Sequence, residues 1–381
     1  MDRANADPPP IALTDLAGDH APLEAALLEA AARVLRSGRY ILGPEVAAFE
    51  GELAAASGVA HAVGLSSGTD ALLAMLMAAG VGPGDEVVTS PFSFFATAAA
   101  IARVGARPVF ADIDPDTLNM DAARAIARIG PRTKAVMVVH IFGRCAPTAA
   151  LEAACAARGI PLFEDAAQAI GAVALDGRRV GARTAGATLS FFPTKNLGGF
   201  GDGGAVLTDD ADFAARLRRL RAQGADRKNH HVEVGGNFRL DELQAALLRV
   251  KLPHLPAWTA ARRRVVARYH EALRGLPIGL PSTDPGAVWN QFVVRVPADR
   301  RAALIAHLAA DGVATEIYYP EPLHLQPALQ GLAHAAGDFP NAERACREVL
   351  ALPPHPSLDD SSITRVTRSL RAFFDATSSA S

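Results

Sequence analysis

Residues 86–111 read EVVTSPFSFFATAAAIARVGARPVFA, and this stretch decides the fold. Glu86–Thr89 and Arg107–Ala111 are short apolar runs of the kind that predicts buried strands. An alanine-rich stretch that starts near Ser93 lies between them and predicts a helix. A strand, a helix and a second strand in this order form a unit whose two strands run parallel in one sheet.

The same alternation continues along the first half of the chain, with helices expected to begin near Thr69, Thr148 and Asp210. Near-continuous apolar strands that alternate with helices are typical of a mainly parallel sheet between helices, so the sequence predicts an α/β fold. In such sheets the functional site lies at the carboxyl ends of the strands. The further strands are expected at His61–Leu65, Ala135–His140, Pro161–Glu164, Ala187–Phe191 and Gly204–Leu207.

The pattern changes after residue 251, where Pro253 and Pro256 interrupt it. We therefore expect a large domain over residues 1–251, with a short flexible N-terminal arm and a helix at Leu23–Arg36. A smaller C-terminal α+β domain is expected over residues 252–381. The elements expected around this boundary are helices at Leu240–Lys251 and Ala257–Arg274 and strands at Gln291–Val296 and Thr315–Tyr319.

The composition excludes several classes of protein. The 381 residues include 38 basic and 40 acidic ones, and the net charge of −2 argues against nucleic-acid binding through bulk positive charge. No apolar run reaches the ~18–20 residues that a membrane span needs, and the N-terminal MDRANADPPP lacks the features of a signal peptide. Three cysteines without a CxxC pair suit a reducing cytoplasm and predict no metal site.

Lysine is rare in this chain, since only four of the 38 basic residues are lysines. If the chemistry needs a lysine amine, Lys195 has to be compared with only three others, which are Lys134, Lys228 and Lys251. Lys251 ends an expected helix, where a positive charge suits the helix dipole.

The segment Gly64-Leu65-Ser66-Ser67-Gly68-Thr69-Asp70 follows a strand and opens a helix. Free backbone N–H groups, hydroxyls and the positive helix end can together bind a phosphate. The alternative is an ordinary helix cap by Ser67 or Thr69, and the segment alone does not decide between the two.

Asp165, in Phe163-Glu164-Asp165-Ala166-Ala167-Gln168, comes at the end of a strand and inside the expected crevice. A buried carboxylate needs a cationic or donor partner, and a protonated pyridine nitrogen would serve. The alternative is that Asp165 caps the next helix.

Lys195 lies in the segment from Ser190 to Gly204, SFFPTKNLGGFGDGG, which leaves another strand end. Glycines allow the backbone to approach a ligand closely. A lysine shielded from solvent there would have a lowered pKa, as an imine-forming amine requires.

A fourth segment, Gly235-Gly236-Asn237-Phe238-Arg239-Leu240-Asp241-Glu242, is a polar turn that runs into a helix. Asn237 could cap that helix or donate to a phosphate in a neighbouring subunit, and the residues alone leave both open.

In this order and spacing, the four segments resemble the DegT/StrS family of pyridoxal-phosphate-dependent nucleotide-sugar aminotransferases, of fold type I. The resemblance extends from Gly43-Pro44-Glu45-Val46 to Leu352-Pro353. It implies the following roles: Lys195 forms the internal aldimine with pyridoxal 5'-phosphate, Asp165 pairs with the pyridine nitrogen, Gln168 contacts the ring hydroxyl, Phe94 stacks on the ring, Gly68, Thr69 and Ser190 hold the phosphate, and Asn237 reaches it from the partner subunit of a homodimer.

The resemblance also implies the reaction. An amino group would pass from an amino acid, expected to be L-glutamate, to a keto nucleotide-sugar by ping-pong aldimine chemistry. Pro193-Thr194-Lys195-Asn196 looks like the branch that acts at C3 of dTDP- or UDP-linked 3-keto sugars. Tyr319, His324 and His231 are candidates for sugar contact, with structural packing or plain solvent exposure as the alternatives.

Three other functions stay open. A 4-keto-sugar aminotransferase is one, although that branch carries a His-Pro-x-Lys pattern. A related sugar dehydratase is another, and the retained Lys195 argues against it because such relatives carry His there. A non-catalytic cofactor-binding regulator is the third, although the sequence has no evident helix-turn-helix or basic stripe.

Overall fold

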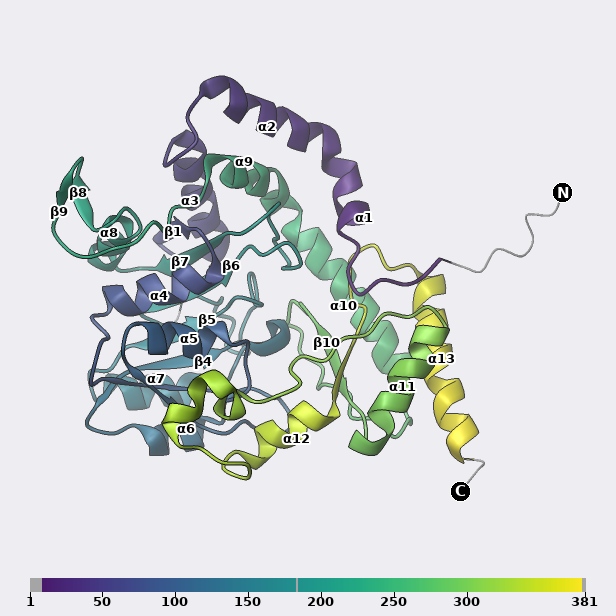
Figure 1. Cartoon of the computed structure of the whole chain (residues 1–381). Coiled ribbons are helices and arrows are strands. Elements are labelled where there is room, and N and C mark those ends of the chain that lie inside the picture. The colour runs from purple at the N-terminus through teal and green to yellow at the C-terminus, as the bar shows by residue number, and fades with distance from the viewer. Residues whose placement is uncertain (1–8, 183, 379–381) are drawn as a thin grey trace.

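A computed structural model describes residues 9–182 and 184–378 (Figure 1). Most of the expected N-terminal arm, residues 1–8, lies outside the described residues. The chain forms a seven-stranded sheet with helices packed around it and a second group of helices at the C-terminal end (Figure 1). None of the helices in the described ranges is long and apolar enough to cross a membrane.

The seven-stranded sheet has the order β1-β7-β6-β5-β4-β2-β3. The five strands from β6 to β3 run parallel, and β7 is antiparallel to both of its neighbours, so the sheet is mainly parallel as predicted. Each strand lies within two residues of its expected position. The bounds are β1 His61–Leu65, β2 Glu86–Thr89, β3 Arg107–Phe110, β4 Thr133–Val139, β5 Leu162–Asp165, β6 Gly186–Ser190 and β7 Gly204–Thr208.

Both faces of the sheet are buried, which explains the near-continuous apolar strands. Along β4, Ala135 and Met137 pack into one apolar cluster, whereas Val136 and Val138 pack into another. The first cluster includes side chains of α4, α5 and α8, and the second includes side chains of α6 and α7. The helices of this part are α1 Leu16–His20, α2 Glu24–Ser37, α3 Pro44–Ser57, α4 Gly68–Ala78, α5 Ala96–Arg103, α6 Ala122–Arg128, α7 Ala149–Ala156, α8 Ala211–Leu220 and α9 Glu242–Lys251.

The C-terminal part has its own small sheet, in which β10 (Phe292–Arg295) pairs antiparallel with β11 (Val349–Leu352). The strand expected at Thr315–Tyr319 is wrong: only an isolated bridge joins Glu316 to Ala351 there. The partner of β10 is instead β11, which the sequence did not predict. The helices are α10 Leu255–Ala272, α11 Ala298–Ala310, α12 Pro340–Glu348 and α13 Asp360–Ser378, and a short hairpin of β8 (Ala225–Arg227) and β9 (His230–His231) projects from the first part.

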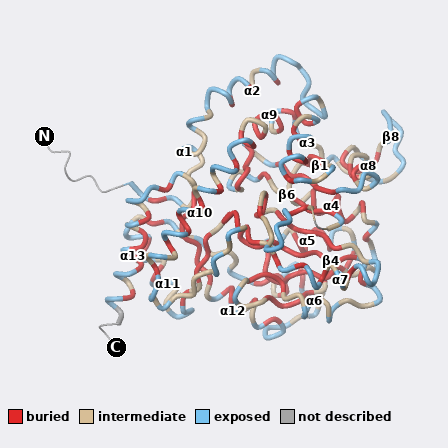
Figure 2. Tube along the Cα trace, turned by 180° about the vertical axis from the view of Figure 1, so that it is seen from behind, coloured by how far each residue is buried: buried red, intermediate tan, exposed pale blue. Residues whose placement is uncertain are grey.

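The N-terminal helices lie across elements far along the chain. Figure 1 shows α2 above α9, and Ala30 and Val34 of α2 pack against Ala246 of α9. Ile11 pairs with Val313 and belongs to the apolar core of the C-terminal elements. Buried residues follow the strands, whereas much of α2 is exposed (Figure 2).

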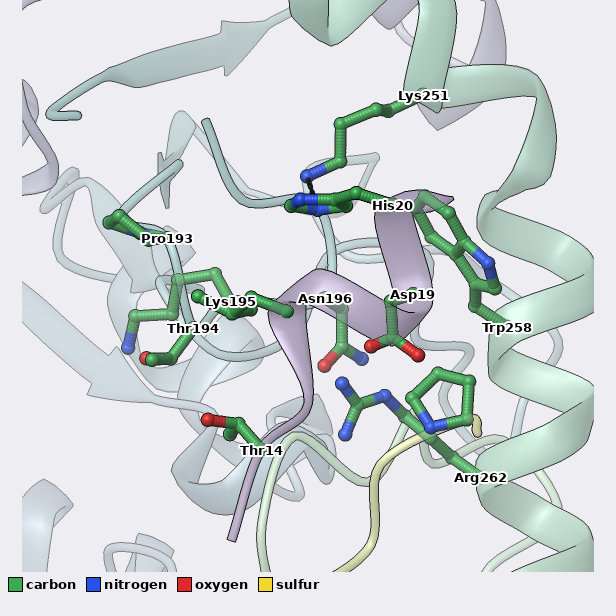
Figure 3. Close-up of a pocket in the computed structure, with 12 residues that line it drawn as sticks. Thr14, Asp19, His20, Pro193, Thr194, Lys195, Asn196, Lys251, Trp258 and Arg262 are labelled. Carbon is green, nitrogen blue, oxygen red and sulfur yellow. Dashed lines mark hydrogen bonds between the residues drawn. The ribbon is translucent and has the colours of Figure 1, made fainter. Parts of the chain in front are cut away.

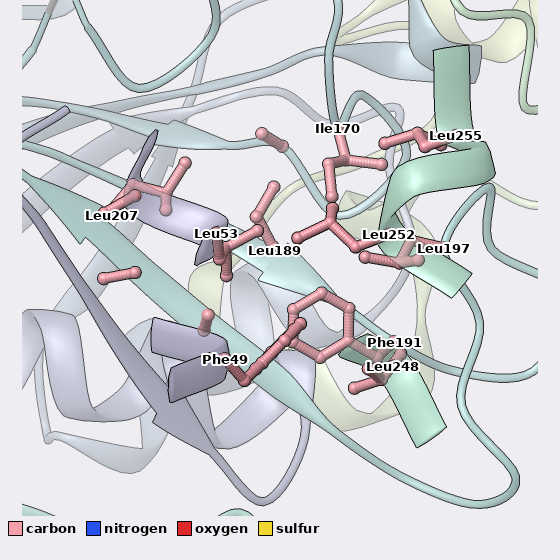
Figure 4. Close-up of a cluster of buried hydrophobic side chains, with 14 of the residues drawn as sticks. Phe49, Leu53, Ile170, Leu189, Phe191, Leu197, Leu207, Leu248, Leu252 and Leu255 are labelled. Atoms are coloured by element: carbon pink, nitrogen blue, oxygen red, sulfur yellow. The ribbon is translucent and has the colours of Figure 1, made fainter. Parts of the chain in front are cut away.

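One apolar cluster includes Phe191 and Leu197, which come shortly before and after Lys195 in the chain (Figure 4). Phe49 of α3 is fully buried there, and its ring meets Phe191 edge to face with centroids 5.4 Å apart. Since Phe191 follows β6 directly, this contact fixes where the chain leaves the sheet before Lys195.

Phe49→Ala should therefore destabilise the protein by about 3–5 kcal/mol, the cost of emptying a well-packed aromatic site. Urea unfolding followed by circular dichroism measures the effect. Leu175→Ala is the matched control, because the 92% exposed Leu175 should change the free energy of unfolding by no more than about 0.5 kcal/mol. Equal effects of the two substitutions would contradict this account of the core.

Candidate active site

A cavity of about 680 Å³ opens at the carboxyl ends of the parallel strands. Its walls come from the start of α4, the segment before α5, the ends of β4, β5 and β6, and the loop at residues 316–319. Eight of the eleven site residues named from the sequence line this one cavity. They are Gly68, Thr69, Phe94, Asp165, Gln168, Ser190, Lys195 and Tyr319.

Lys195 sits in a compact turn after β6. Its backbone N–H donates to the carbonyl of Phe192 at 2.8 Å, and Gly199 N–H donates to the carbonyl of Phe191 at 2.7 Å. Burial lowers the pKa of the Lys195 amine to about 8, although the nearby Asp165 carboxylate opposes the shift. A useful fraction of this amine is therefore an uncharged nucleophile near neutral pH, unlike that of an ordinary lysine.

Asp165 ends β5 as a buried residue, and its two carboxylate oxygens are held differently. Oδ2 accepts a hydrogen bond from the Thr97 hydroxyl at 2.7 Å, and Oδ1 accepts one from Ala167 N–H at 3.2 Å. Burial raises the pKa of this carboxyl, and the hydrogen bonds oppose that shift. Asp165 does not cap a helix, because no helix follows β5 directly. Its carboxylate faces the cavity, where a cationic group of a ligand would compensate its burial.

The start of α4 approaches β6 too closely for any side chain at position 68. A Cβ on Gly68 would lie 2.7 Å from the Ser190 Cβ and 3.0 Å from its Oγ. Ser67 is the helix cap, because its hydroxyl accepts from Asp70 N–H at 3.0 Å. Capping by Ser67 leaves the backbone of Gly68 and Thr69 at the cavity wall, together with the Ser190 hydroxyl. Capping and phosphate binding are therefore compatible at this helix end.

Gln168 and Tyr319 are joined across the cavity wall. Gln168 Nε2 donates to the Tyr319 hydroxyl at 3.1 Å, and Gln168 Oε1 accepts from Phe142 N–H at 2.6 Å. Burial raises the pKa of Tyr319, so its hydroxyl stays protonated. The ring of Phe94 is 59% exposed and lies 6.2 Å from the Tyr319 ring, where it forms an apolar surface at the cavity.

Three residues named from the sequence do not line this cavity. His324 is buried against Phe339, with ring centroids 4.7 Å apart, and its Nε2 lies 3.2 Å from Glu343 Oε1. Its side chain is therefore packed against these residues and does not face the cavity. His231 and Asn237 are exposed, and Nδ1 of His231 lies 2.9 Å from the carbonyl of Gln223. Asn237 does not cap α9, because that helix begins only at Glu242.

The sequence did not point to the hydroxyl chain behind Asp165. Ser93 Oγ lies 2.8 Å from Thr97 Oγ1, which in turn donates to Asp165. The spacing of four residues around the start of α5 is a weak signal that only the position of Asp165 makes meaningful. No group of three or more potential ligands within the described ranges could hold a metal ion.

Comparison with known proteins agrees with this geometry. The sequence model of the DegT/DnrJ/EryC1/StrS aminotransferase family matches residues 22–371. The chain is 44% identical over 371 residues to the dTDP-3-amino-3,4,6-trideoxy-alpha-D-glucose transaminase of Streptomyces venezuelae, covering 97% of each protein. It is 44% identical over 340 residues to the UDP-2-acetamido-2-deoxy-3-oxo-D-glucuronate aminotransferase of Pseudomonas aeruginosa, covering 89% of this chain and 93% of that protein. A pleiotropic regulatory protein of Geobacillus stearothermophilus is 43% identical over 369 residues, which are 96% of this chain and 98% of that protein.

Solved structures match over a similar length. DesV of S. venezuelae, crystallised in complex with a ketimine intermediate, superposes with a TM-score of 0.94 at 44% identity, covering 97% of this chain and 99% of that one. NtdA of Bacillus subtilis, crystallised with bound cofactor PMP, has a TM-score of 0.90 at 29% identity, covering 98% and 87%. The chain belongs to the DegT/DnrJ/EryC1/StrS aminotransferase family.

Proposed function

We propose that this protein is a pyridoxal-phosphate-dependent aminotransferase that moves an amino group from L-glutamate to C3 of a keto nucleotide-sugar. One observation carries the proposal: the amine of Lys195 and the carboxylate of Asp165 face the same cavity as the N-terminus of α4. The relatives named for dTDP- and UDP-linked sugars with nitrogen at position 3 support the substrate class.

The residues around the cavity fit pyridoxal phosphate. The gap between α4 and β6, too narrow for a Cβ at Gly68, brings backbone N–H groups and the Ser190 hydroxyl together for a phosphate. Asp165 needs a cationic partner, which a protonated ring nitrogen supplies. The second N–H of the Gln168 amide is free to reach a ring hydroxyl, and Phe94 offers a face for the ring.

When bound, pyridoxal phosphate supplies an aldehyde that takes up amines and a conjugated ring that accepts an electron pair. The chain supplies the remaining functions. Asp165 would hold a proton on the ring nitrogen of the bound cofactor, and Thr97 fixes the orientation of the carboxylate. The lowered pKa of Lys195 lets Nζ accept a proton from the substrate carbon and return it at a second position.

We propose that residues 1–251 bind the cofactor and that residues 252–381 form a smaller domain that closes the cavity. Gln291 and the segment at residues 316–319 support this division, because they form the wall that faces the cofactor residues. Tyr319 is our candidate for contact with the sugar. We further propose that the protein works as a cytoplasmic homodimer in which Asn237 completes the partner's phosphate site.

A product screen tests the substrate class. Incubation with glutamate and 3-keto or 4-keto nucleotide-sugars should yield an amino sugar from the 3-keto substrates, with one 2-oxoglutarate formed for each. Mass spectrometry of both products measures this outcome. A deoxy-keto product without glutamate consumption would favour a dehydratase. Bound cofactor without any turnover would favour a regulatory role like that in the name of the Geobacillus relative.

Lys195→Arg should abolish covalent capture of pyridoxal phosphate, because a guanidinium does not form an imine. Borohydride reduction followed by peptide mapping should place the cofactor on Lys195 in the wild type and nowhere in the variant. Capture should become faster as pH rises through about 8, where the amine loses its proton. Lys134→Arg, at an exposed position near the start of β4, is the control and should behave as wild type. Capture by the Lys195→Arg protein would overturn the assignment.

Asp165→Asn should retain cofactor binding but lower kcat on the order of 10²-fold, the loss typical of removing one electrostatic stabiliser. Equilibrium dialysis and stopped-flow measurement of the glutamate half-reaction separate the two effects. Thr97→Val should cause a smaller loss, since the carboxylate remains. Asp299→Asn, at an exposed position in the first turn of α11, is the control. Near-normal turnover by Asp165→Asn would refute the role of this carboxylate.

Mixed dimers test the shared site. Lys195→Ala and Asn237→Ala homodimers should both be impaired, but a heterodimer of the two contains one site with both native residues. Each heterodimer should therefore have about half the wild-type activity, and random exchange of equal amounts of the two variants should restore about a quarter of the wild-type level to the mixture. Activity that never exceeds the sum of the two variants would contradict a site built from two subunits.

A further inference from the structure

A buried lysine, Lys251, lines a second and smaller pocket together with Lys195 (Figure 3). Lys251, the last residue of α9, is only 2% exposed. Its Nζ donates to the carbonyl of Gly198 and lies 2.7 Å from His20 Nε2. The ammonium also lies 5.3 Å from the centre of the Phe200 ring. Lys251 is therefore a buried hydrogen-bond donor to the main chain, and not an exposed cation at a helix end.

Gln244 holds the same turn from the same helix. Its Oε1 accepts a hydrogen bond from Phe200 N–H at 2.9 Å. Gln244 and Lys251 are seven residues apart, which places them on one face of α9, two turns from each other. This face therefore binds the main chain on both sides of Gly199, through one acceptor and one donor.

The turn needs such support because two of its three residues are glycines, and only Phe200 has a side chain to pack. A Cβ on Gly198 would lie 2.1 Å from the carbonyl oxygen of Pro193, and a Cβ on Gly199 would lie 2.8 Å from Gln244 Oε1. Because the contact with Pro193 is with the main chain, position 198 requires glycine, whereas a Cβ at position 199 would mainly displace the end of the Gln244 side chain. A glycine-rich turn is conformationally free unless polar groups fix its backbone, and a buried carbonyl such as that of Gly198 needs a donor.

The groups that face Lys251 favour its role as a donor. His20 of α1 has a pKa lowered to about 4 by burial and by Lys251, so its ring is neutral and Nε2 can accept. Burial lowers the pKa of Lys251 to about 8, with Asp19 opposing the shift. Lys251 is thus mostly protonated at neutral pH. Arg262 lines the same space, and its pKa is lowered to about 10 by burial.

We propose that Lys251 and Gln244 are positioning residues that hold the turn at residues 198–200, and through it the amine of Lys195, in its place at the cavity. The proposal rests on the proposed function of Lys195 as the reacting amine. Neither residue lines the cavity, and both are hydrogen-bonded to the main chain of the turn and not to the Lys195 amine.

The test compares Lys251→Met and Gln244→Leu with the exposed control Lys134→Met. The cofactor-free proteins are treated with formaldehyde and dimethylamine–borane at a series of pH values, and methylation of Lys195 is followed by peptide mass spectrometry. With only four lysines in the chain, the Lys195 peptide is easily resolved. Wild-type protein should give a midpoint of about 8. Both variants should shift it upward by about one unit, because a loosened turn lets water reach the amine.

A second measurement uses the loaded enzyme. In the glutamate half-reaction the maximal rate should fall about tenfold in each variant while KM for glutamate stays unchanged, since orientation and not binding is disturbed. Loss of thermal stability alone, with normal pH profile and rate, would reduce both residues to a structural role and overturn the proposal.

Gln244→Leu decides the interpretation because it removes no charge. Repulsion between two ammonium groups cannot explain a shift in that variant, so a shift confined to Lys251→Met overturns the proposal. If Lys251→Met does not fold, Gln244→Leu alone carries the test. The methylation profile needs no cofactor. A wild type without transaminase activity but with the expected profiles would therefore reject the proposed function and leave the positioning role standing.

Discussion

The site depends on the burial of one carboxylate. Asp165 lies at the end of a central strand, and within the described residues its carboxylate accepts hydrogen bonds from Thr97 and Ala167. Such a group is costly to bury unless a positive charge compensates it. The same enclosure that raises the pKa of Asp165 lowers that of Lys195, so one cavity prepares an acid–base pair with opposite shifts. Asp165 ends β5 and Lys195 lies in the turn that follows the neighbouring β6, so the sheet positions both groups at one edge.

Helix α9 links this chemistry to the rest of the large core. At its start, the buried Glu242 accepts hydrogen bonds from Gly43, Glu45 and Val46 N–H at 2.7–2.9 Å and so holds the beginning of α3. Phe49 of α3 then packs against the segment that precedes Lys195. One helix thus holds the segment around Lys195 directly through its own side chains and indirectly through the core.

Most strand positions of the large sheet could be predicted, because they follow from the order of apolar, polar and turn-forming residues within short stretches of the sequence. β1 and β2 have the expected bounds, since apolar runs of strand length bounded by turn residues leave little choice. Asp165 and Lys195 meet in one cavity because parallel strands end at the same edge. The segment at residues 315–319 reads as a strand but joins its neighbour by one bridge only, because β10 pairs with β11 instead. Which strands pair with each other depends on contacts between distant parts of the chain. The residue pattern within one segment does not specify those contacts.

Side-chain environments were harder to predict than strand positions. His324 lies in a polar-looking segment, yet it packs under Phe339, which follows it by fifteen residues. Lys251 reads as a surface cation at a helix end, but it contacts a carbonyl 53 residues earlier in the chain. Thr97 is one hydroxyl among several near α5, and only the folded sheet brings it to Asp165. In each case, the contact that defines the environment of the side chain joins residues that are separated in the sequence.

The two walls of the cavity are built from different kinds of structure, and this affects how substrate specificity can change by mutation. The residues that we assign to the cofactor come from the sheet and its adjoining turns, whereas the facing wall at residues 316–319 belongs to a loop without regular secondary structure. Substitutions in that loop can reshape the space for a sugar without disturbing the strands that hold Asp165 and Lys195. A new acceptor sugar could thus be accommodated by mutation of one loop, with the nitrogen-transfer chemistry inherited unchanged.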